Sequence, residues 1–176
     1  LTDKKILAYH DRSDGGLITT LIEMSFASRL GLEINLDTVL EDDKKLIDFL
    51  FNEELGVVIQ VHTKDLDCVY DLLHESGFKD HSHNLGFISV EKEINFSYRD
   101  KKILSFPLKA LLENWHKVGF EIQSLRDNPI TAEAEFRNDT DINNSGLRPT
   151  LKFSIPKKIK LNSTRPRVAI LREQGV

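Results

Sequence analysis

Two spacings of apolar residues alternate along the first half of the chain. Apolar residues three and four positions apart predict helices at residues 15–30, 46–55 and 63–76. Alternating or β-branched apolar runs predict strands, the first ending at residues 6–8 as a buried strand and the others covering residues 32–36, 57–61 and 85–90. This alternation predicts an α/β (α+β) domain, with a mixed sheet and packed helices.

Glycines and small polar residues predict where these helices end. We expect Gly31 to form a left-handed cap after the first helix and Gly77 to follow the third. Thr63 is a candidate N-cap of the third helix, because its hydroxyl can accept hydrogen bonds from the first free N–H groups.

A hairpin pattern is followed by the longest helical pattern of the chain. Residues 94–98 and 103–106 alternate around a polar turn, which predicts a β-hairpin. Pro107 suits a first helical position, and apolar residues then continue at helical spacing until the Asn-Pro pair at 128–129. Trp115 lies in this apolar stripe, so we expect it in the core.

The last forty residues predict a linker and the start of a further element. Residues 137–149 are rich in Asn, Asp and Gly and lack an apolar period, and residues 151–155 are expected to add one strand. Residues 156–167 carry five basic side chains and two prolines, which favour a solvated linker over an anion-binding arm. Residues 168–171 then begin a new buried strand.

An acidic turn separates the first strand from the first helix. Residues 9–17 read Tyr-His-Asp-Arg-Ser-Asp-Gly-Gly-Leu, and the glycines fall at the helix start. Free backbone N–H groups and the positive end of the helix dipole favour an anion there. Asp11 and Asp14 could hold Mg²⁺ between carboxylate and phosphate oxygens, and Ser13 adds a hydroxyl. The turn therefore predicts a site for a phosphate and its metal ion.

The same turn also has a purely structural interpretation. Asp14 could be the N-cap of the helix, accepting hydrogen bonds from the N–H groups two and three residues later. Gly15 and Gly16 would then serve only the tight entry into the helix. The pattern alone leaves both interpretations open.

Composition limits the possible functions. The 176 residues, 40% of them hydrophobic, can form one compact domain with a tail. A net charge of -4 and a pI near 5.9 argue against a nucleic-acid partner. The single cysteine, Cys68, cannot form an intrachain disulfide and is expected in the core. No long apolar run or signal-peptide pattern predicts a membrane partner or secretion, so we expect a cytoplasmic protein.

Four segments together resemble one known family over nearly the whole chain. They are AYHDRSDGGL at 8–17, LFNEELGVVIQV at 50–61, SLRDNP at 124–129 and RPRVAILREQGV at 165–176. In this order they resemble the large, single-chain form of phosphoribosylformylglycinamidine synthase, an ATP-dependent carbon–nitrogen ligase with glutamine as amido donor. That family converts formylglycinamide ribonucleotide, glutamine and ATP into formylglycinamidine ribonucleotide in de novo purine biosynthesis.

The resemblance implies a domain division. Residues 1–136 would be a synthetase domain similar to the C-terminal domain of aminoimidazole ribonucleotide synthetase-type proteins. Residues 137–167 would be a linker, and residues 168–176 the start of a truncated glutaminase domain. The expected partners are the N-terminal synthetase domains and the glutaminase domain of the same parent polypeptide.

The resemblance also implies roles within the acidic turn. Asp11 matches the family's Mg²⁺ ligand, Ser13 matches a nucleotide-contacting residue, and Gly15 and Gly16 form the helix start beside the nucleotide. This nucleotide site is implied to be auxiliary, so no residue of the chain is expected to be catalytic. Mg²⁺ and ATP or ADP would be shared with a partner domain missing from this chain, so the isolated fragment is predicted to be inactive.

Other polar residues favour structural roles. His10 ends a strand, where a hydrogen-bonded histidine is more common than a general acid or base. The spacing of His74, Asp80, His81 and His83 fits no standard metal pattern. Asn52, Glu53 and Glu54 close a helix, and the two acids are expected to be solvated, although the family motif leaves a role at a domain interface open. A different class of function also remains open, namely a non-catalytic interaction or scaffold domain with no ligand site.

Overall fold

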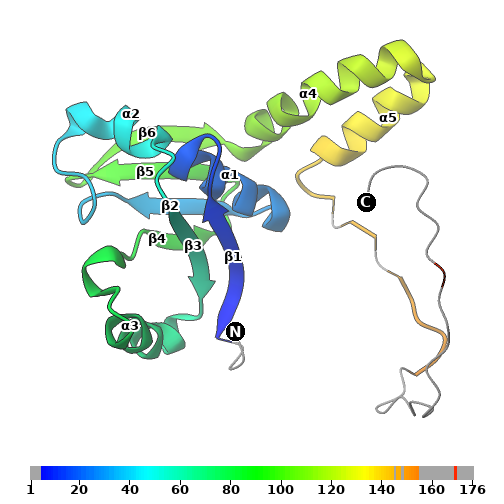
Figure 1. Cartoon of the computed structure of the whole chain (residues 1–176). Coiled ribbons are helices and arrows are strands. Elements are labelled where there is room, and N and C mark those ends of the chain that lie inside the picture. Colours follow the sequence, from blue (N-terminus) through cyan, green and yellow to red (C-terminus); the bar gives the residue numbers. More distant parts are fainter. Residues whose placement is uncertain (1–4, 145, 148, 155–168, 170–176) are drawn as a thin grey trace. The chain divides into compact units, whose positions relative to one another are not determined.

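The chain divides into two compact units, Leu1–Asn144 and Ser145–Val176. A computed structural model describes residues 5–144, 146–147, 149–154 and 169. In the first unit the strands and helices alternate as the sequence predicted (Figure 1). They are, in chain order, β1 (Ile6–Arg12), α1 (Gly16–Ser28), β2 (Gly31–Asn35), α2 (Leu46–Phe51), β3 (Gly56–Val61), α3 (Leu66–Glu75), β4 (Gly86–Ser89), β5 (Glu93–Tyr98), β6 (Lys101–Pro107), α4 (Leu108–Arg126) and α5 (Pro129–Thr140). Short 3-10 turns cover Asp43–Lys45, Thr63–Asp65 and Lys79–His81.

The strands form two separate sheets. A four-stranded sheet has the order β4-β2-β5-β6, in which β2 and β5 are parallel and the other pairs antiparallel. β1 and β3 form an antiparallel two-stranded sheet of their own. The predicted mixed sheet with packed helices is confirmed, and β5 and β6 are the predicted hairpin.

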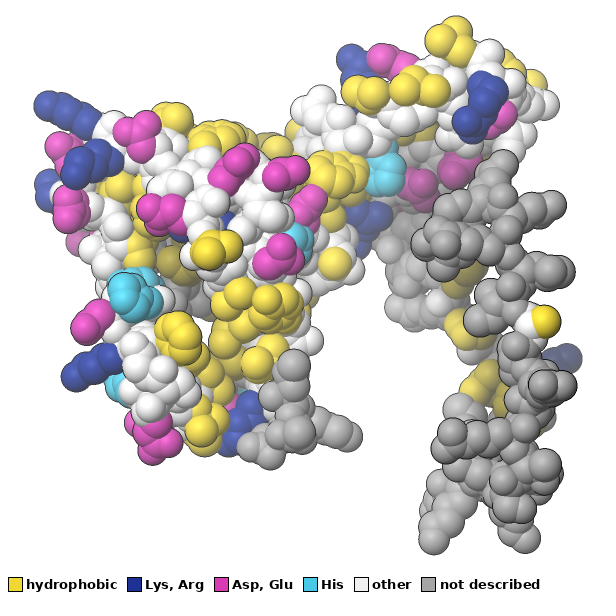
Figure 2. Space-filling view, viewed as in Figure 1, with side chains coloured by type: hydrophobic (Ala, Val, Ile, Leu, Met, Phe, Trp, Pro, Cys, Tyr) yellow, Lys and Arg dark blue, Asp and Glu magenta, His cyan; other side chains and the backbone are white. Residues whose placement is uncertain are grey.

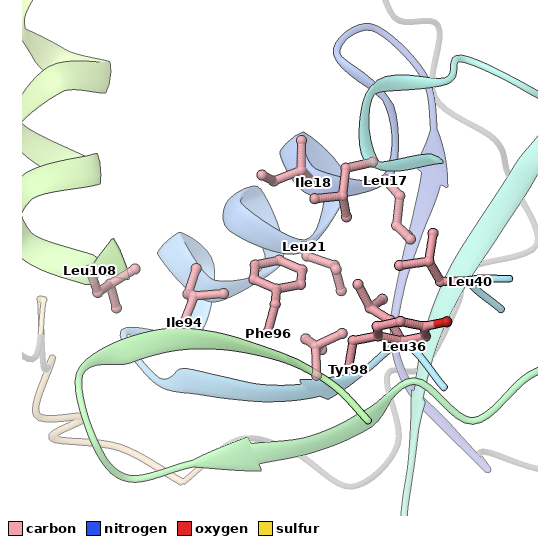
Figure 3. Close-up of a cluster of buried hydrophobic side chains, with 11 residues drawn as sticks. Leu17, Ile18, Leu21, Leu36, Leu40, Ile94, Phe96, Tyr98 and Leu108 are labelled. Atoms are coloured by element: carbon pink, nitrogen blue, oxygen red, sulfur yellow. The ribbon is translucent and has the colours of Figure 1, made fainter. Parts of the chain in front are cut away.

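The core lies between α1 and the four-stranded sheet. Figure 3 shows Leu21 of α1 close to Phe96 of β5, with Ile94 of the same strand beside them. Phe96 and Ile94 are fully buried. Burial of one such side chain contributes about 1.5–3 kcal/mol to the stability of the fold. The packing of α1 on β5 therefore fixes the start of α1, and with it the turn that joins β1 to α1.

The ends of α1 differ from the predicted caps. Its N-cap is Gly15, so the interpretation of Asp14 as a capping residue is wrong. Arg29, with a φ of 55°, takes the left-handed position after the helix that was predicted for Gly31. Gly31 instead begins β2, where an added Cβ would collide with the backbone oxygens of Glu91 and Glu93. This glycine is required by the close approach of two chain segments, which local sequence cannot reveal.

The cap of the third helix also differs from the prediction. Thr63 lies in the 3-10 turn, and Asp65 is the N-cap of α3. Gly77 follows α3 with a φ of 87°, as predicted, and its N–H donates to the His74 oxygen at 3.0 Å. Cys68 is exposed rather than buried, because α3 presents this side chain to Lys5. The hydrogen bond from Lys5 Nζ to Cys68 Sγ, 3.0 Å long, raises the pKa of Lys5.

β1 is not the buried strand that its apolar residues predicted. Leu7 is 45% exposed and Tyr9 is 59% exposed, and Val57 of β3 lies on the surface too. Figure 2 shows apolar side chains gathered over β1 and β3. A two-stranded sheet can bury only the face that packs on α1, so its other apolar face stays uncovered.

The predicted long helix is confirmed as α4, but a second helix follows it. The Asn-Pro pair at 128–129 starts α5 rather than ending the helical region. Asn128 Oδ1 accepts hydrogen bonds from the N–H groups of Ile130 and Thr131, and Pro129 occupies the first turn. The rings of Phe120 and Phe136 stack with their centroids 4.6 Å apart and hold α4 and α5 together as a helical hairpin (Figure 1). α5 therefore crosses the predicted domain boundary at residue 136.

The core prediction for α4 holds only for its first two turns. Leu108 and Leu112 are buried, whereas Trp115 is 54% exposed and touches Phe26 edge-on at a centroid distance of 5.7 Å. Trp115 was predicted to be buried and is not, because α4 runs past the end of the sheet that would have covered it.

Only residues 146–147, 149–154 and 169 of the second unit are described. Residues 151–154 form no strand, which contradicts the extra strand predicted there, and residue 155 lies outside the described residues. The basic segment 156–167 lies outside them as well, as does the predicted strand at 168–171 except for Ala169. Within the described part of the chain, no helix is both long enough and apolar enough to cross a membrane.

Candidate nucleotide-binding turn

The acidic turn joins the end of β1 to the start of α1. Asp11 pairs with Val57 in the two-stranded sheet, and its side chain is 68% exposed. Ser13 and Asp14 are exposed in the turn itself. The strand, turn and helix order therefore matches the prediction, and the carboxylates of the turn are open to solvent.

The two glycines have a structural role as well as a position suited to a ligand. Gly15 and Gly16 have φ values of 81° and 72°, a region that side chains disfavour. A Cβ on Gly16 would lie 2.7 Å from the Leu50 oxygen and 2.7 Å from the Phe51 carbonyl carbon. The turn can approach the end of α2 this closely only because residue 16 is glycine.

The backbone amides of the turn already have acceptors. The Gly15 N–H donates to Glu53 Oε1 at 2.9 Å, and the Gly16 N–H donates to the Ser13 oxygen at 2.9 Å. The sequence predicts free N–H groups at this helix start, and the structure instead pairs both amides. In this structure the Gly15 amide therefore donates to an anionic oxygen, that of the Glu53 carboxylate.

Arg12 fixes the residues around Glu53 beside the turn. Its Nε donates to the Asn52 oxygen at 2.8 Å, and a terminal nitrogen donates to the Phe49 oxygen at 3.1 Å. The side-chain oxygen of Asn52 accepts from the Glu54 N–H at 3.1 Å. The sequence predicted Glu53 as a solvated acid with a possible interface role, and it did not predict the contact with the turn, because 38 residues separate Glu53 from Gly15 and no short spacing connects them.

His10 belongs to the framework of the turn. Its Nε2 lies 2.8 Å from Glu23 Oε2, and its Nδ1 lies 2.7 Å from the Asp11 backbone oxygen. The Thr20 hydroxyl donates to the same oxygen at 3.3 Å. With both ring nitrogens engaged, His10 orients Asp11 and has the structural role that its position favoured.

The carboxylate of Asp11 is suited to share a metal ion with other groups. Among the described residues, no three His, Cys, Asp or Glu side chains are grouped so that they could hold a metal, and this includes His74, Asp80, His81 and His83. Mg²⁺ commonly binds one or two protein carboxylates and completes its shell with phosphate oxygens and water. A single exposed carboxylate beside an anion-binding amide fits that pattern.

A family model matches more than half of the chain. The model, described as AIR synthase related protein, C-terminal domain, covers residues 1–97. The chain belongs to this family. The match includes both sheets except β6 and the last residue of β5. It also includes the acidic turn and the Glu53 segment, so the candidate site lies within the family domain.

Two yeast proteins are similar to this AIR synthase related chain over 97% of its length. Both are named phosphoribosylformylglycinamidine synthase; the one from Saccharomyces cerevisiae is 46% identical and the one from Schizosaccharomyces pombe is 42% identical. The chain spans only 13% of the length of each.

Solved structures confirm the fold. "T. maritima PurL complexed with ATP" matches with a TM-score of 0.54 over 62% of this chain and 19% of that chain. "T. maritima PurL complexed with FGAR" matches with a TM-score of 0.53 over 62% of this chain and 18% of that chain. Both are 16% identical to this chain, so the similarity concerns the fold.

Proposed function

We propose that the chain is part of a phosphoribosylformylglycinamidine synthase, the ligase that uses ATP and glutamine to convert formylglycinamide ribonucleotide to formylglycinamidine ribonucleotide. The proposal is supported by the two yeast relatives of that name, which are 46% and 42% identical across 97% of this chain. Its partners are then the N-terminal synthetase domains and the glutaminase domain of one polypeptide, in the cytoplasm.

We further propose that the acidic turn supplies part of an auxiliary Mg²⁺-nucleotide site. Asp11 binds the metal ion, and Ser13, Gly15 and Gly16 contact the phosphates of ATP or ADP. The observation that carries this proposal is the hydrogen bond between the Gly15 N–H and a carboxylate, next to the exposed carboxylate of Asp11. On binding, a phosphate oxygen replaces Glu53 at this amide.

In this site the charges of the metal ion, the phosphates and the helix decide which groups bind which. Mg²⁺ neutralises the phosphates, and the positive end of α1 adds to this effect. The chain's own residues hold the metal from one side only, so the remaining ligands come from the N-terminal synthetase domains. Ammonia transfer takes place elsewhere, and none of these residues is catalytic.

The test is a calorimetric titration of the full-length protein with MgADP, after bound nucleotide and metal have been removed with EDTA. We expect Asp11→Asn to weaken binding at the auxiliary site at least tenfold, because it removes the metal-binding charge. Asp67→Asn, on the exposed face of α3, is the control and should leave the affinity unchanged. Equal affinities of the wild type and Asp11→Asn would refute the role of the turn.

A second candidate function is a non-catalytic interaction module without a ligand site. Two observations favour it: the amides of Gly15 and Gly16 are already paired, and the outer face of β1 and β3 is apolar and exposed. In that case Glu53 is a permanent cap of the turn. Glu53→Gln separates the two, since it should strengthen nucleotide binding if Glu53 competes with a phosphate and leave it unchanged if there is no site.

A further inference from the structure

Cys68 is the single cysteine of the chain, and the fold places it on the surface rather than in the core. It belongs to the first turn of α3, where it is exposed to small molecules in the solvent. Because the chain has no second cysteine, no disulfide within it can form when this sulfur is oxidised. The groups beside the sulfur therefore decide which product an oxidant gives.

A lysine amine lies directly against the sulfur. Lys5 precedes β1, and its Nζ donates to Cys68 Sγ at 3.0 Å. The same Nζ lies 3.6 Å from Asp65 Oδ1, and the side chains of Lys5 and Asp65 are 29% and 24% exposed. Lys5 is thus held by two groups of one segment, with its nitrogen next to the sulfur. The contact joins the start of β1 to α3, across 63 residues of sequence (Figure 1).

The surroundings of Cys68 are those of a reactive cysteine. Reactive cysteines are partly exposed and commonly lie beside a lysine, an arginine or a histidine, whereas inert cysteines are buried. Cys68 has both features of the reactive class. Oxidation converts such a sulfur first to a sulfenic acid, and a sulfenic acid condenses with a nearby thiol or nitrogen. In the folded chain, Lys5 Nζ is a nitrogen already in contact with that sulfur.

We propose that Cys68 and Lys5 form a reversible covalent link when the protein is exposed to hydrogen peroxide. Cys68 Sγ attacks one peroxide oxygen, the O–O bond breaks, and the products are the sulfenic acid and water. The neutral amine of Lys5 then attacks the sulfur, the S–O bond breaks, and the hydroxyl leaves as a second water with one proton from the nitrogen. The product is a sulfenamide, with an S–N bond between the two side chains. The sulfur has lost two electrons, and the peroxide has gained them.

The link protects the sulfur from further oxidation. A free sulfenic acid can be oxidised to the sulfinic and sulfonic acids, and these steps are irreversible for an ordinary cysteine. Two molecules of a thiol reductant restore the cysteine and the amine from the sulfenamide, and they form a disulfide with each other. Lys5 thus has the role that a second, resolving cysteine has in a redox pair. This inference does not depend on the proposed function.

The charge of Lys5 controls the second step. The pKa of Lys5 is raised, first by its hydrogen bond to Cys68 and to a smaller extent by Asp65. The amine is therefore protonated at neutral pH and has to release a proton before it can attack the sulfur. Formation of the link should accordingly become faster as the pH rises.

Mass spectrometry of the full-length protein tests the link. The folded protein is treated with hydrogen peroxide, the remaining thiols are alkylated, and digests with and without a thiol reductant are compared. We expect a linked pair of peptides containing Lys5 and Cys68, with the summed mass of the two less two hydrogen atoms, and the reductant should abolish this pair. The proposal is overturned if Cys68 goes to the sulfinic or sulfonic acid without this pair, or if peroxide leaves Cys68 unoxidised.

Two lysine variants show whether the amine of Lys5 is responsible. Lys5→Arg keeps a positive charge beside the sulfur and removes the reactive amine, so the fraction of Cys68 that the reductant restores should fall at least tenfold. Lys64→Arg is the matched control, because Lys64 is exposed in the turn before α3 and has no contact with the sulfur; it should form the link as the wild type does. An unchanged restored fraction in Lys5→Arg would overturn the proposal.

Oxidation in urea gives a comparison that needs no variant. Unfolding separates Lys5 from Cys68, because only the fold brings these distant residues together. The yield of the linked peptides should therefore fall at least tenfold, and Cys68 should be oxidised irreversibly instead. Equal yields in the folded and unfolded protein would show that the contact between Lys5 and Cys68 does not direct the reaction, and the proposal would fail.

Discussion

At the scale of single residues, the glycines of this chain have three different explanations. Gly77 follows a helix in a left-handed conformation, and this was visible in the sequence. Gly16 and Gly31 are required by backbone segments that approach them from distant parts of the chain. Gly119 faces open space among the described residues, where nothing within 4 Å of an added Cβ requires a glycine.

The contrast between Gly16 and Gly119 gives a stability prediction. Gly16→Ala should reduce the free energy of unfolding by about 1–3 kcal/mol, because the methyl group collides with the end of α2 at a positive φ. Gly119→Ala, the matched control, should increase it by up to about 1 kcal/mol. Urea denaturation of the 176-residue chain measures both, and a neutral Gly16→Ala would show that the turn can move away from α2.

Glu53 illustrates the limit of sequence motifs at this scale. The motif around Asp11 was recognised because its residues are adjacent in the chain. The residues that complete its surroundings come from the segment after α2, and folding alone brings them to the turn.

At the scale of elements, α4 shows that periodicity predicts a helix better than it predicts burial. The apolar spacing extends from Leu108 to Leu125, and the helix has nearly the same extent. Only its first turns meet the sheet: Leu112 is 1% exposed and Leu125 is 91% exposed. The apolar stripe was read as one core face, but its second half lies on the surface.

The difference in burial between the two halves of α4 can be measured with leucine-to-alanine substitutions. Leu112→Ala should reduce the free energy of unfolding by about 2–5 kcal/mol, because it leaves a cavity beneath α4. Leu125→Ala should change it by less than about 0.5 kcal/mol. Thermal or urea unfolding of the two variants provides the comparison, and a large loss for Leu125→Ala would mean that the exposed stripe is covered within the isolated chain.

At the scale of the whole molecule, the described residues leave two apolar surfaces uncovered. One face of β1 and β3 is exposed, as is the second half of α4. Two such surfaces fit a chain that spans 13% of the length of its yeast relatives. The apolar residues there are available to pack against other parts of a longer polypeptide.

The isolated chain should therefore be inactive. We expect no formation of the amidine product from formylglycinamide ribonucleotide, glutamine and ATP, and MgADP binding much weaker than in the full-length protein, because one carboxylate and one amide cannot hold the ligand alone. A product assay and a calorimetric titration of the 176 residues check both. Tight MgADP binding by this chain would show that it contains the complete site.

The sequence by itself determined the order and type of the elements from β1 to α4, the hairpin of β5 and β6, and the place of the acidic turn between β1 and α1. These features depend on local spacing and on residues that are adjacent in the chain. Only the tertiary structure decided that β1 lies in a separate two-stranded sheet, that Arg29 rather than Gly31 caps α1, and that Glu53 occupies the Gly15 amide. These features depend on contacts between residues far apart in the chain, and such contacts leave no periodic signal in the sequence.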